Sequence, residues 1–274
     1  MIDISNFTRV VRFKLKDSLF PFNYEDFFLN NLPTSASLFN NTTLLMVNCV
    51  NPHTGLKLLE FYAKYLNFKE VLLFTHEELL SKDVKIVKIA HLRSWTAYNN
   101  FVLTLNSFVN SPFSLLVQTD GVILNPSKFT SDFFSYDYLG APWPNDQKWI
   151  NAQTCAYQSF LSKNKFYNRI GNGGFSLRSK KFLEYSSQFT STDNLGEDFF
   201  LNVLNYEKAL DFRVSYPSVD IGLKFAVENP VSELGMKWGL NYEINPKNHF
   251  GTHGMQFMNS KYFNQNLQLS SYTS

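Results

Sequence analysis

Four apolar runs in the first half of the chain constrain its fold most strongly. They occupy residues 42–50, 71–75, 84–89 and 113–118. Each has the length of one strand, and continuous runs of this kind are typical of strands buried on both faces of a parallel sheet. Apolar residues recur at helical spacing over 56–66, and residues 94–109 favour a second helix with Ser94 as its N-cap. This alternation predicts an α/β chain with a doubly wound, mostly parallel sheet flanked by helices.

The second half of the chain is less regular. It predicts short strands at 136–141 and 175–178, helices at 180–189 and 197–205, and a polar loop over 145–168. Residues 1–41 are expected to form an irregular N-terminal segment that wraps the domain. We find no internal repeat and no linker, so the sequence predicts a single domain over residues 1–274.

Charge and composition exclude several classes of protein. The 25 Lys and Arg residues nearly balance 23 Asp and Glu residues, so the net charge of +2 offers no basic surface for nucleic acid. No apolar stretch reaches about 18 residues, so we expect no transmembrane segment. The first residues lack the pattern of a signal peptide, and we expect a cytoplasmic protein. Cys49 and Cys155 have no CxxC or metal-ligand spacing and are expected to be reduced thiols.

Asp120 is the first candidate for chemistry, because it follows the fourth apolar run and precedes Gly121. Ligands of α/β sheets bind beyond the carboxyl ends of the strands. That rule places Asn51, Thr75 and Thr119 on the same rim as Asp120. A carboxylate there can meet a hard cation or a sugar hydroxyl. The alternative is a plain turn, since Asp-Gly is a common turn pair.

The segment Gly171-Asn172-Gly173-Gly174 is a second candidate. Its glycines carry no Cβ, so a ligand can approach the backbone N–H groups closely. No Gly-Lys-Ser/Thr follows, and the spacing is not that of a dinucleotide fingerprint, so it is not a Walker loop or a Rossmann motif. A flexible turn is the alternative.

Two adjacent carboxylates, Glu197 and Asp198, precede a run of large apolar residues. At the start of a helix, neighbours point in different directions, so one can face a pocket while the other makes structural hydrogen bonds. A carboxylate beside an apolar wall is a reasonable general base, because desolvation raises its pKa. The alternative is simple charge in a first helical turn, where it is favoured by the helix dipole.

Histidines and tryptophans supply the remaining candidates. His249 and His253 have the i, i+4 spacing of a zinc helix, but Gly251 between them argues against a helix. One histidine paired with a distant carboxylate on a divalent ion is the functional interpretation, and a hydrogen-bonded loop histidine is the alternative. Trp143 and Trp149 could stack on a sugar face or pack at a rim.

These segments, taken in order, resemble the glycosyltransferases of GT-A type, many of which are grouped as a domain of unknown function. The resemblance covers roughly residues 42–254, and the string from Asn172 to Ser179 is its most specific part. The residues that carry it are Val117-Gln118-Thr119-Asp120-Gly121, Tyr136-Asp137-Tyr138-Leu139-Gly140-Ala141-Pro142-Trp143, Gly171-Asn172-Gly173-Gly174-Phe175-Ser176-Leu177-Arg178-Ser179, Glu197-Asp198 and His249-Phe250-Gly251-Thr252-His253-Gly254.

The resemblance implies that residues 42–125 bind a nucleotide-sugar donor and residues 126–254 bind the acceptor and carry catalysis, with 255–274 as a C-terminal tail. The acceptor would be a glycan or glycoconjugate whose biosynthesis takes place in the cytoplasm or at the adjoining membrane surface. Trp143 and Trp149 are the expected acceptor contacts. The expected donor contacts are Asn51, Thr119, Asp120, Gly121, Asn172, Gly173 and Gly174.

A divalent metal, Mn²⁺ or Mg²⁺, is also implied by the resemblance. Asp120 is similar to the last residue of the Asp-x-Asp motif, which holds this metal against the donor diphosphate. His253 matches the C-terminal histidine that completes the metal site in many GT-A enzymes. Gln118 stands where the first Asp would be, and this departure weakens the expectation of a metal, because one carboxylate binds it less firmly than two.

The Glu197-Asp198 pair resembles the x-Glu-Asp motif, whose Asp often serves as the catalytic base of inverting members. Asp198 would take the proton of the acceptor hydroxyl, and the metal would stabilise the leaving diphosphate as a Lewis acid. Single displacement inverts the anomeric centre, although the sequence leaves retention open. The interpretation requires Asp120, Gly173, Asp198 and His253 to surround one place.

Two other functions fit parts of the sequence. Gln118 in place of a carboxylate favours a non-catalytic carbohydrate-binding or scaffold protein on a degenerate GT-A fold. A nucleotidyltransferase has a similar sheet, but it usually needs a basic, Gly-rich loop after the first strand. Residues 51–55 offer no cluster of Lys or Arg there.

Overall fold

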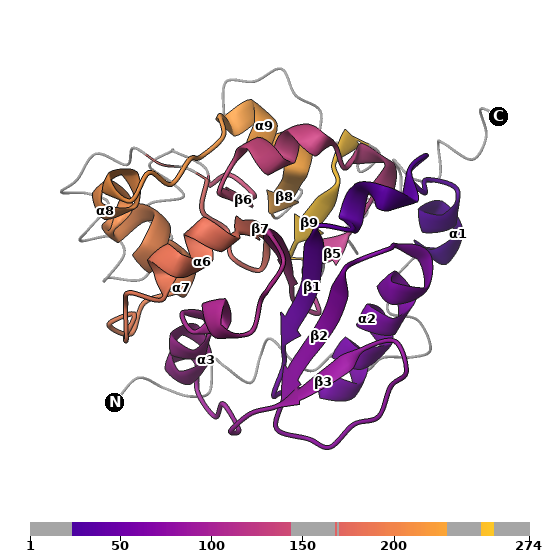
Figure 1. The fold of residues 1–274 in the computed structure, drawn as a ribbon, viewed down its shortest axis with the longest axis horizontal. Helices are drawn as coiled ribbons and strands as arrows, with labels where there is room; N and C mark the ends of the chain where they lie inside the picture. The colour runs from indigo at the N-terminus through magenta and orange to yellow at the C-terminus, as the bar shows by residue number, and fades with distance from the viewer. Residues whose placement is uncertain (1–23, 144–167, 169, 229–247, 255–274) are drawn as a thin grey trace.

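The computed structural model describes residues 24–143, 168, 170–228 and 248–254, which form a mixed α/β fold around a six-stranded sheet with the order β3-β2-β1-β4-β7-β6 (Figure 1). Three pairings in this sheet are parallel, and the two that involve β7 are antiparallel. The strands are β1 (Thr42–Val47), β2 (Glu70–Thr75), β3 (Lys85–Lys88), β4 (Phe113–Val117), β6 (Tyr138–Gly140) and β7 (Phe175–Ser179).

Strands β1, β2 and β4 are buried on both faces, as their apolar runs require. Strand β3 lies at the edge of the sheet, and its residues are exposed or half-buried, so the prediction of a fully buried strand there is wrong. Along β1, Leu44 and Met46 pack into the core beneath α2 (Pro52–Tyr65), whereas Leu45 and Val47 pack into a second core on the opposite face. The second core also takes side chains from α3 (Trp95–Val102), the 3₁₀ turn η3 (Leu105–Ser107) and α6 (Lys180–Ser186). In Figure 1, α2 and α3 accordingly lie on opposite sides of the sheet.

Strand β7 brings the second half of the chain back into the sheet, antiparallel to both β4 and β6. Phe175 and Leu177 alternate with Ser176 and Arg178, and only the first two join the apolar core beneath α2. A smaller three-stranded sheet, ordered β5-β9-β8, follows β4 along the rim. Its strands are β5 (Val122–Ile123), β8 (Ala226–Glu228) and β9 (Gly251–His253).

The remaining elements are short. The helices are α1 (Tyr24–Leu29), α7 (Glu197–Phe199), α8 (Tyr206–Asp211) and α9 (Val219–Phe225), the 3₁₀ turns are η2 (Ala36–Phe39), η4 (Pro126–Lys128) and η5 (Ser131–Ser135), and η6 (Phe200–Leu204) is a π-helix. In the part of the chain that the structure describes, no helix has the length and apolarity needed to cross a membrane.

The predicted α/β class, with a central sheet between helices, is confirmed, and the differences lie at element ends. The helix expected over 94–109 ends at Val102, close to Thr104, whose hydroxyl donates to the Phe101 carbonyl. The expected helix 197–205 is divided into α7, η6 and α8. Part of it is π-helical, and the side-chain amide of Asn205 donates to the Phe200 carbonyl.

The prediction that residues 1–41 are irregular is wrong for their described part, which contains α1 and η2. Tyr24 and Phe28 lie one helical turn apart and are both buried, with their rings against Phe61 and Tyr62. Packing onto α2 therefore stabilises a helix too short to persist alone. The expected loop at 145–168, apart from Asn168, lies outside the described residues, and so do Trp149 and Cys155.

Candidate active site

The candidate residues at the carboxyl ends of the parallel strands lie in two places, at the start of α2 and in the turn after β4. Asn51 caps α2 by accepting a hydrogen bond from the Thr54 N–H at 3.3 Å, so its side-chain oxygen already serves the helix. Thr119 and Asp120 form the turn between β4 and β5, which is closed by a hydrogen bond from the Gly121 N–H to the Gln118 carbonyl at 3.0 Å. Asp120 is therefore a turn residue whose carboxylate also belongs to the site described next.

His253, on β9, is the point on which the candidate residues converge. Its Nε2 lies 3.6 Å from Asp120 Oδ1 and 3.3 Å from Gln118 Oε1. Its Nδ1 lies 2.9 Å from the side-chain amide nitrogen of Asn172 and 3.4 Å from Glu228 Oε1. Strand β9 lies between β5 and β8, which brings the imidazole to the turn that follows β4.

The charge on His253 follows from these neighbours. Burial disfavours the imidazolium, but the hydrogen bond to Glu228 and the charges of Asp120, Glu228 and Asp198 outweigh it and raise the pKa of His253 to about 9. At neutral pH the ring is therefore a cation held among carboxylates. A cationic ligand that displaces its proton would meet the same negative field.

The Gly173-Gly174 pair allows two close approaches that no other residue permits. A Cβ on Gly174 would overlap the His253 ring, and a Cβ on Gly121 would overlap the Gly174 carbonyl. A Cβ on Gly173 would overlap the Glu197 carboxylate and the Cβ of Asp198. The glycines thus bring the start of β7 against the imidazole on one side and the two acids on the other.

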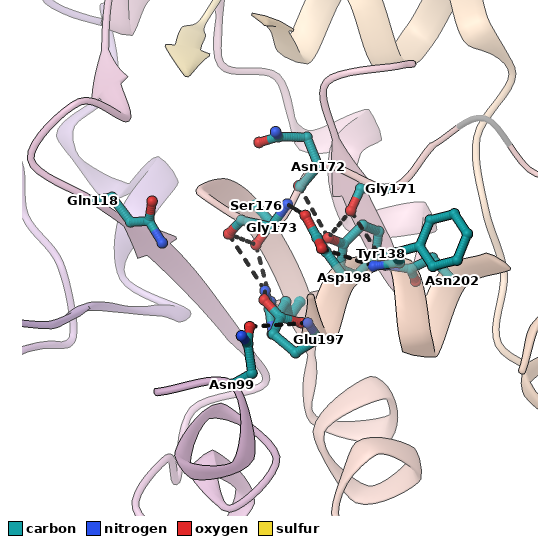
Figure 2. Close-up of polar contacts among 12 residues, drawn as sticks. Asn99, Gln118, Tyr138, Gly171, Asn172, Gly173, Ser176, Glu197, Asp198 and Asn202 are labelled. Carbon is teal, nitrogen blue, oxygen red and sulfur yellow. Dashed lines mark hydrogen bonds and ion pairs between the residues drawn. The ribbon is translucent and has the colours of Figure 1, made fainter. Parts of the chain in front are cut away.

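Asp198 is partly buried at the start of α7 and faces Gly173 (Figure 2). Its Oδ2 accepts a hydrogen bond from the Gly173 N–H at 2.9 Å, and its Oδ1 accepts one from the Phe199 N–H at 2.8 Å. Burial and the neighbouring charge of Glu197 raise the pKa of Asp198 to about 7, against the lowering effect of these two hydrogen bonds. A carboxyl group with this pKa can take up a proton near neutral pH.

Glu197 has a different environment, because it is almost completely buried in an ion pair. Its Oε1 lies 2.9 Å from Nη2 of Arg178, with side-chain exposures of 4% and 0% for the two residues. The backbone N–H of Glu197 donates to Asn99 Oδ1 at 3.0 Å. The pair of adjacent acids therefore points in two directions, as a helix start predicts, with one carboxylate paired and the other partly exposed.

His253 Nε2 and two oxygen atoms near it have the chemistry to hold a divalent metal. Gln118 donates its amide N–H to the Tyr98 hydroxyl at 2.7 Å, which leaves Oε1 directed toward His253. Donor atoms that share one ion lie roughly 3 Å apart, and Gln118 Oε1 and Asp120 Oδ1 stand 3.3 and 3.6 Å from His253 Nε2. Oxygen and imidazole donors of this kind suit a divalent cation such as Mn²⁺ or Mg²⁺. Across 24–143, 168, 170–228 and 248–254, no three His, Cys, Asp or Glu residues form a metal cluster by themselves.

The tryptophan and the second histidine lie in apolar surroundings. Trp143 is 7% exposed, and its ring covers Gly171 and packs 6.3 Å from the Phe199 ring. Its predicted acceptor contact stays a prediction, as does that of Trp149. His249 is fully buried, and its Nδ1 lies 2.6 Å from the Leu223 carbonyl. His249 and His253 therefore do not form a joint site.

The site also contains residues to which the sequence assigned no role. Arg178 pairs with Glu197, Glu228 contacts His253, and Tyr98 orients Gln118. Arg178 carried a usable signal, because a charged residue alternating with apolar ones in a buried strand requires a buried partner. Glu228 and Tyr98 carried none, since each meets its partner only through the fold.

Comparisons with known proteins give one family and several distant structures. The sequence profile of a family described as "Protein of unknown function (DUF5672)" matches residues 81–253. No protein among those with curated functions matches the sequence.

The solved structures that resemble the fold are distant. A galactosyltransferase LgtC in complex with donor and acceptor sugar analogs is 12% identical, with 85% of this chain and 96% of that chain covered and a TM-score of 0.42. An active-site mutant of LgtC is 11% identical with the same coverage and a TM-score of 0.39. The glycosyltransferase GlyE of Streptococcus pneumoniae TIGR4 is 13% identical, with 62% of this chain and 49% of that chain covered and a TM-score of 0.33.

Proposed function

The chain belongs to the DUF5672 family, and we propose that it is an inverting, metal-assisted glycosyltransferase. It would move a sugar from a nucleotide-sugar donor to a hydroxyl of a glycan or glycoconjugate acceptor. The observation that carries the proposal is the convergence of four segments distant in sequence. Asp120 lies 3.6 Å from His253, Gly174 lies against the His253 ring, and the neighbouring Gly173 N–H donates to Asp198.

Asp198 would be the catalytic base. The acceptor hydroxyl loses its proton to the Asp198 carboxylate as its oxygen bonds to the anomeric carbon, while the bond from that carbon to the donor phosphate oxygen breaks. The nucleoside diphosphate leaves with the electron pair, and single displacement inverts the anomeric centre. A pKa of about 7 supports this role, because a large share of the group is ionised at neutral pH and the carboxylate is basic enough to accept the proton.

Asp120, Gln118 and His253 would hold the metal on the donor side. When bound there, Mn²⁺ or Mg²⁺ would act as a Lewis acid on the diphosphate, which gains negative charge as it leaves. The backbone of Gly173 and Gly174 would face the donor sugar, and Asn51, Thr119, Gly121 and Asn172 are the further donor contacts that we propose. The two tryptophans, Trp143 and Trp149, are the proposed acceptor contacts.

A second candidate function is a carbohydrate-binding or scaffold protein without catalysis. The amide of Gln118 favours it, because Gln118 occupies the place of a metal-binding carboxylate and brings no negative charge. A scaffold of this kind would bind a glycan but no nucleotide sugar.

The first experiment is a thermal-shift screen of nucleotide sugars, each with and without Mn²⁺. Stabilisation grows with the ratio of free ligand to Kd, so a true donor raises the melting temperature and the metal increases the shift. Failure of every UDP, GDP and dTDP sugar, together with stabilisation by a glycan, would favour the scaffold.

The second experiment replaces Asp198 with Asn and measures sugar transfer with the donor so identified. Transfer should fall by about 10²–10⁴-fold, the usual contribution of a general base, with donor binding retained. Asp211→Asn is the matched control, because Asp211 is an exposed acid at the end of α8 and should leave the rate unchanged. Undiminished transfer by the Asp198 variant would remove it from the base role.

A further inference from the structure

Arg178 is a guanidinium buried in the sheet, and the proposed chemistry does not use it. It lies on β7 with 0% exposure, against the rings of Tyr138 at 5.5 Å and Phe182 at 5.9 Å. Burying a charge costs several kcal/mol even when it is paired, and a buried ion pair is often no more stable than apolar residues of equal volume. Stability alone is therefore a weak reason for an arginine here.

The ion pair is also incompletely satisfied. Within the described residues, Nη1 of Arg178 and Oε2 of Glu197 are buried without a hydrogen-bond partner. A buried polar atom without a partner costs roughly 1–3 kcal/mol. The arrangement therefore sacrifices stability, which is typical of groups that are retained for what they position.

Both groups that Arg178 holds are immediate neighbours of Asp198. Nη2 lies 2.9 Å from Oε1 of Glu197, the residue before Asp198, and 3.4 Å from the carbonyl of Gly173, whose N–H donates to Asp198. Nε donates to the Ser176 hydroxyl at 2.9 Å, and that hydroxyl donates to the same Gly173 carbonyl at 3.1 Å. One guanidinium thus contacts the residue before Asp198 and the residue whose N–H donates to the Asp198 carboxylate.

In Figure 2, Gly173 and Ser176 lie above Glu197 and Asn99, and Asp198 lies beside Gly173. The Asn99 side chain, on α3, accepts a hydrogen bond from the Glu197 N–H, so α3 also fixes the start of α7. A lysine would not reproduce these contacts, since Arg178 donates from two separate atoms, Nε and Nη2, and a lysine has a single donor nitrogen.

We propose that Arg178 is a positioning residue for Asp198. By holding the Gly173 carbonyl and the Glu197 carboxylate, it directs the Gly173 N–H at Asp198 Oδ2 and fixes the carboxylate toward the acceptor hydroxyl. Glu197 takes no proton in the reaction and serves only as the counter-ion of Arg178. This inference rests on the proposed role of Asp198 as the base.

The test removes both charges together, because Arg178→Met alone leaves a buried carboxylate unpaired and endangers folding. The double variant Arg178→Met/Glu197→Met keeps volume in the core and should stay folded. We expect its kcat to fall by about 10²-fold, the usual result of a misplacement near 1 Å, with the donor KM within about twofold. Lys85→Met/Glu70→Met is the matched control, because it removes a strand-borne ion pair of 3.0 Å in the parallel part of the sheet.

A conservative variant separates positioning from packing. Glu197→Gln keeps the shape and the hydrogen-bond acceptor but leaves the Arg178 guanidinium without its counter-ion, so its melting temperature should fall. Because the Gln oxygen can still accept from Nη2, the variant should retain a larger part of kcat per folded molecule than the double variant. A purely structural role would lower the melting temperature of both variants and leave kcat per folded molecule unchanged. That result would overturn the proposal.

Amide hydrogen exchange at Gly173 provides a readout that does not need activity. With the Gly173 carbonyl released, exchange at its N–H should accelerate by about tenfold in the double variant and remain unchanged in the Lys85/Glu70 control. Unchanged exchange in the double variant would overturn the positioning role whether or not the wild type transfers sugar. If the wild type transfers, Asp198→Asn does not, and the double variant matches the wild type in kcat, only the role of Arg178 fails.

Discussion

Two parts of the central sheet differ in the side chains that they bury. Along β1, β2 and β4, the apolar part of the sheet, both faces are covered mainly by apolar side chains. Around β7 and β6, the buried side chains include charged and amide groups that depend on specific partners. The buried polar residues of this part are Asp137, Asn168, Asn172, Ser176, Arg178, Ser179, Glu197, Asn202 and Asn205.

The difference teaches where this chain can tolerate change. Apolar contacts are numerous and non-directional, so the parallel part can accept another apolar side chain of similar size. A polar network fails when one partner is lost, because the other stays buried without compensation. The candidate site lies in the polar part. Its geometry is fixed by specific partners there, so the loss of a single side chain should disturb it most.

The largest expected effect comes from breaking the buried ion pair. Arg178→Met alone should lower the free energy of unfolding by about 3–5 kcal/mol, because the Glu197 carboxylate stays buried without its partner. Urea unfolding measures this loss. In the double variant Arg178→Met/Glu197→Met, most of the loss should disappear, and a double variant as unstable as the single one would contradict the comparison.

In the apolar part of the sheet, Leu116→Ala should lower the free energy of unfolding by about 3 kcal/mol, because it removes buried apolar surface and leaves a cavity. Leu116 is fully buried and belongs to the core between β1, β4 and α3. Transfer per folded molecule should not change, in contrast to the variants of β7. Leu116→Met is the control, with an expected loss below about 1.5 kcal/mol.

Acid should weaken the fold through His249, which is buried in apolar surroundings outside the central sheet. Burial lowers the pKa of His249 to about 4, although the hydrogen bond to the Leu223 carbonyl raises it. The unfolded chain, with a histidine pKa near 6.5, binds the proton first as pH falls. Stability from this residue is therefore present above pH 6.5 and is lost between pH 6.5 and 4, by roughly 3 kcal/mol.

The measurement for His249 is the difference in unfolding free energy between the wild type and His249→Phe from pH 8 to 4. Subtraction removes the opposite contribution of Asp198, whose raised pKa stabilises the protonated fold at low pH. Parallel curves for the two proteins would show that His249 is not the acid-sensitive group.

The pH dependence of transfer should follow the ionisation of Asp198. Below the pKa of about 7 the base is protonated, so kcat/KM should rise about tenfold per pH unit and level off above it. Stopped or continuous assays from pH 5 to 8 test this. A flat profile would separate Asp198 from the rate-limiting proton transfer.

The smallest effect is expected at the exposed ion pair between β3 and β2. Lys85 is 67% exposed and lies 3.0 Å from Glu70. Lys85→Met should change the free energy of unfolding by less than about 1 kcal/mol, because solvent screens such pairs. A loss as large as that of Arg178→Met would erase the distinction between the two parts of the sheet.

The parallel part of the fold could be predicted from the sequence because its signal is local. Continuous apolar runs such as residues 42–47 can be satisfied only by burial on both faces. The direction of β7 could not be predicted, because the alternation Phe175-Ser176-Leu177-Arg178 is the same for either direction of a strand. The structure buries both the apolar and the polar face of this strand.

The site was predictable in its members and not in its contacts. Asp120, Gly173, Asp198 and His253 could be named from motifs and from a family resemblance. The partners of Arg178 and His253 could not, because Glu197 lies 19 residues from Arg178 and Gln118 lies 135 residues from His253. Contacts of that span are set by packing of the whole domain.

The position of β9 late in the chain has a consequence for folding during synthesis. The parallel strands are complete once Val117 has emerged, but His253 is supplied by the last described strand. Domains are synthesised from the N-terminus at about 5–20 residues per second. Several seconds therefore pass between the synthesis of β4 and that of His253, whose imidazole faces Asp120. A prematurely terminated chain would contain the hydrophobic scaffold and lack the histidine around which its acids gather.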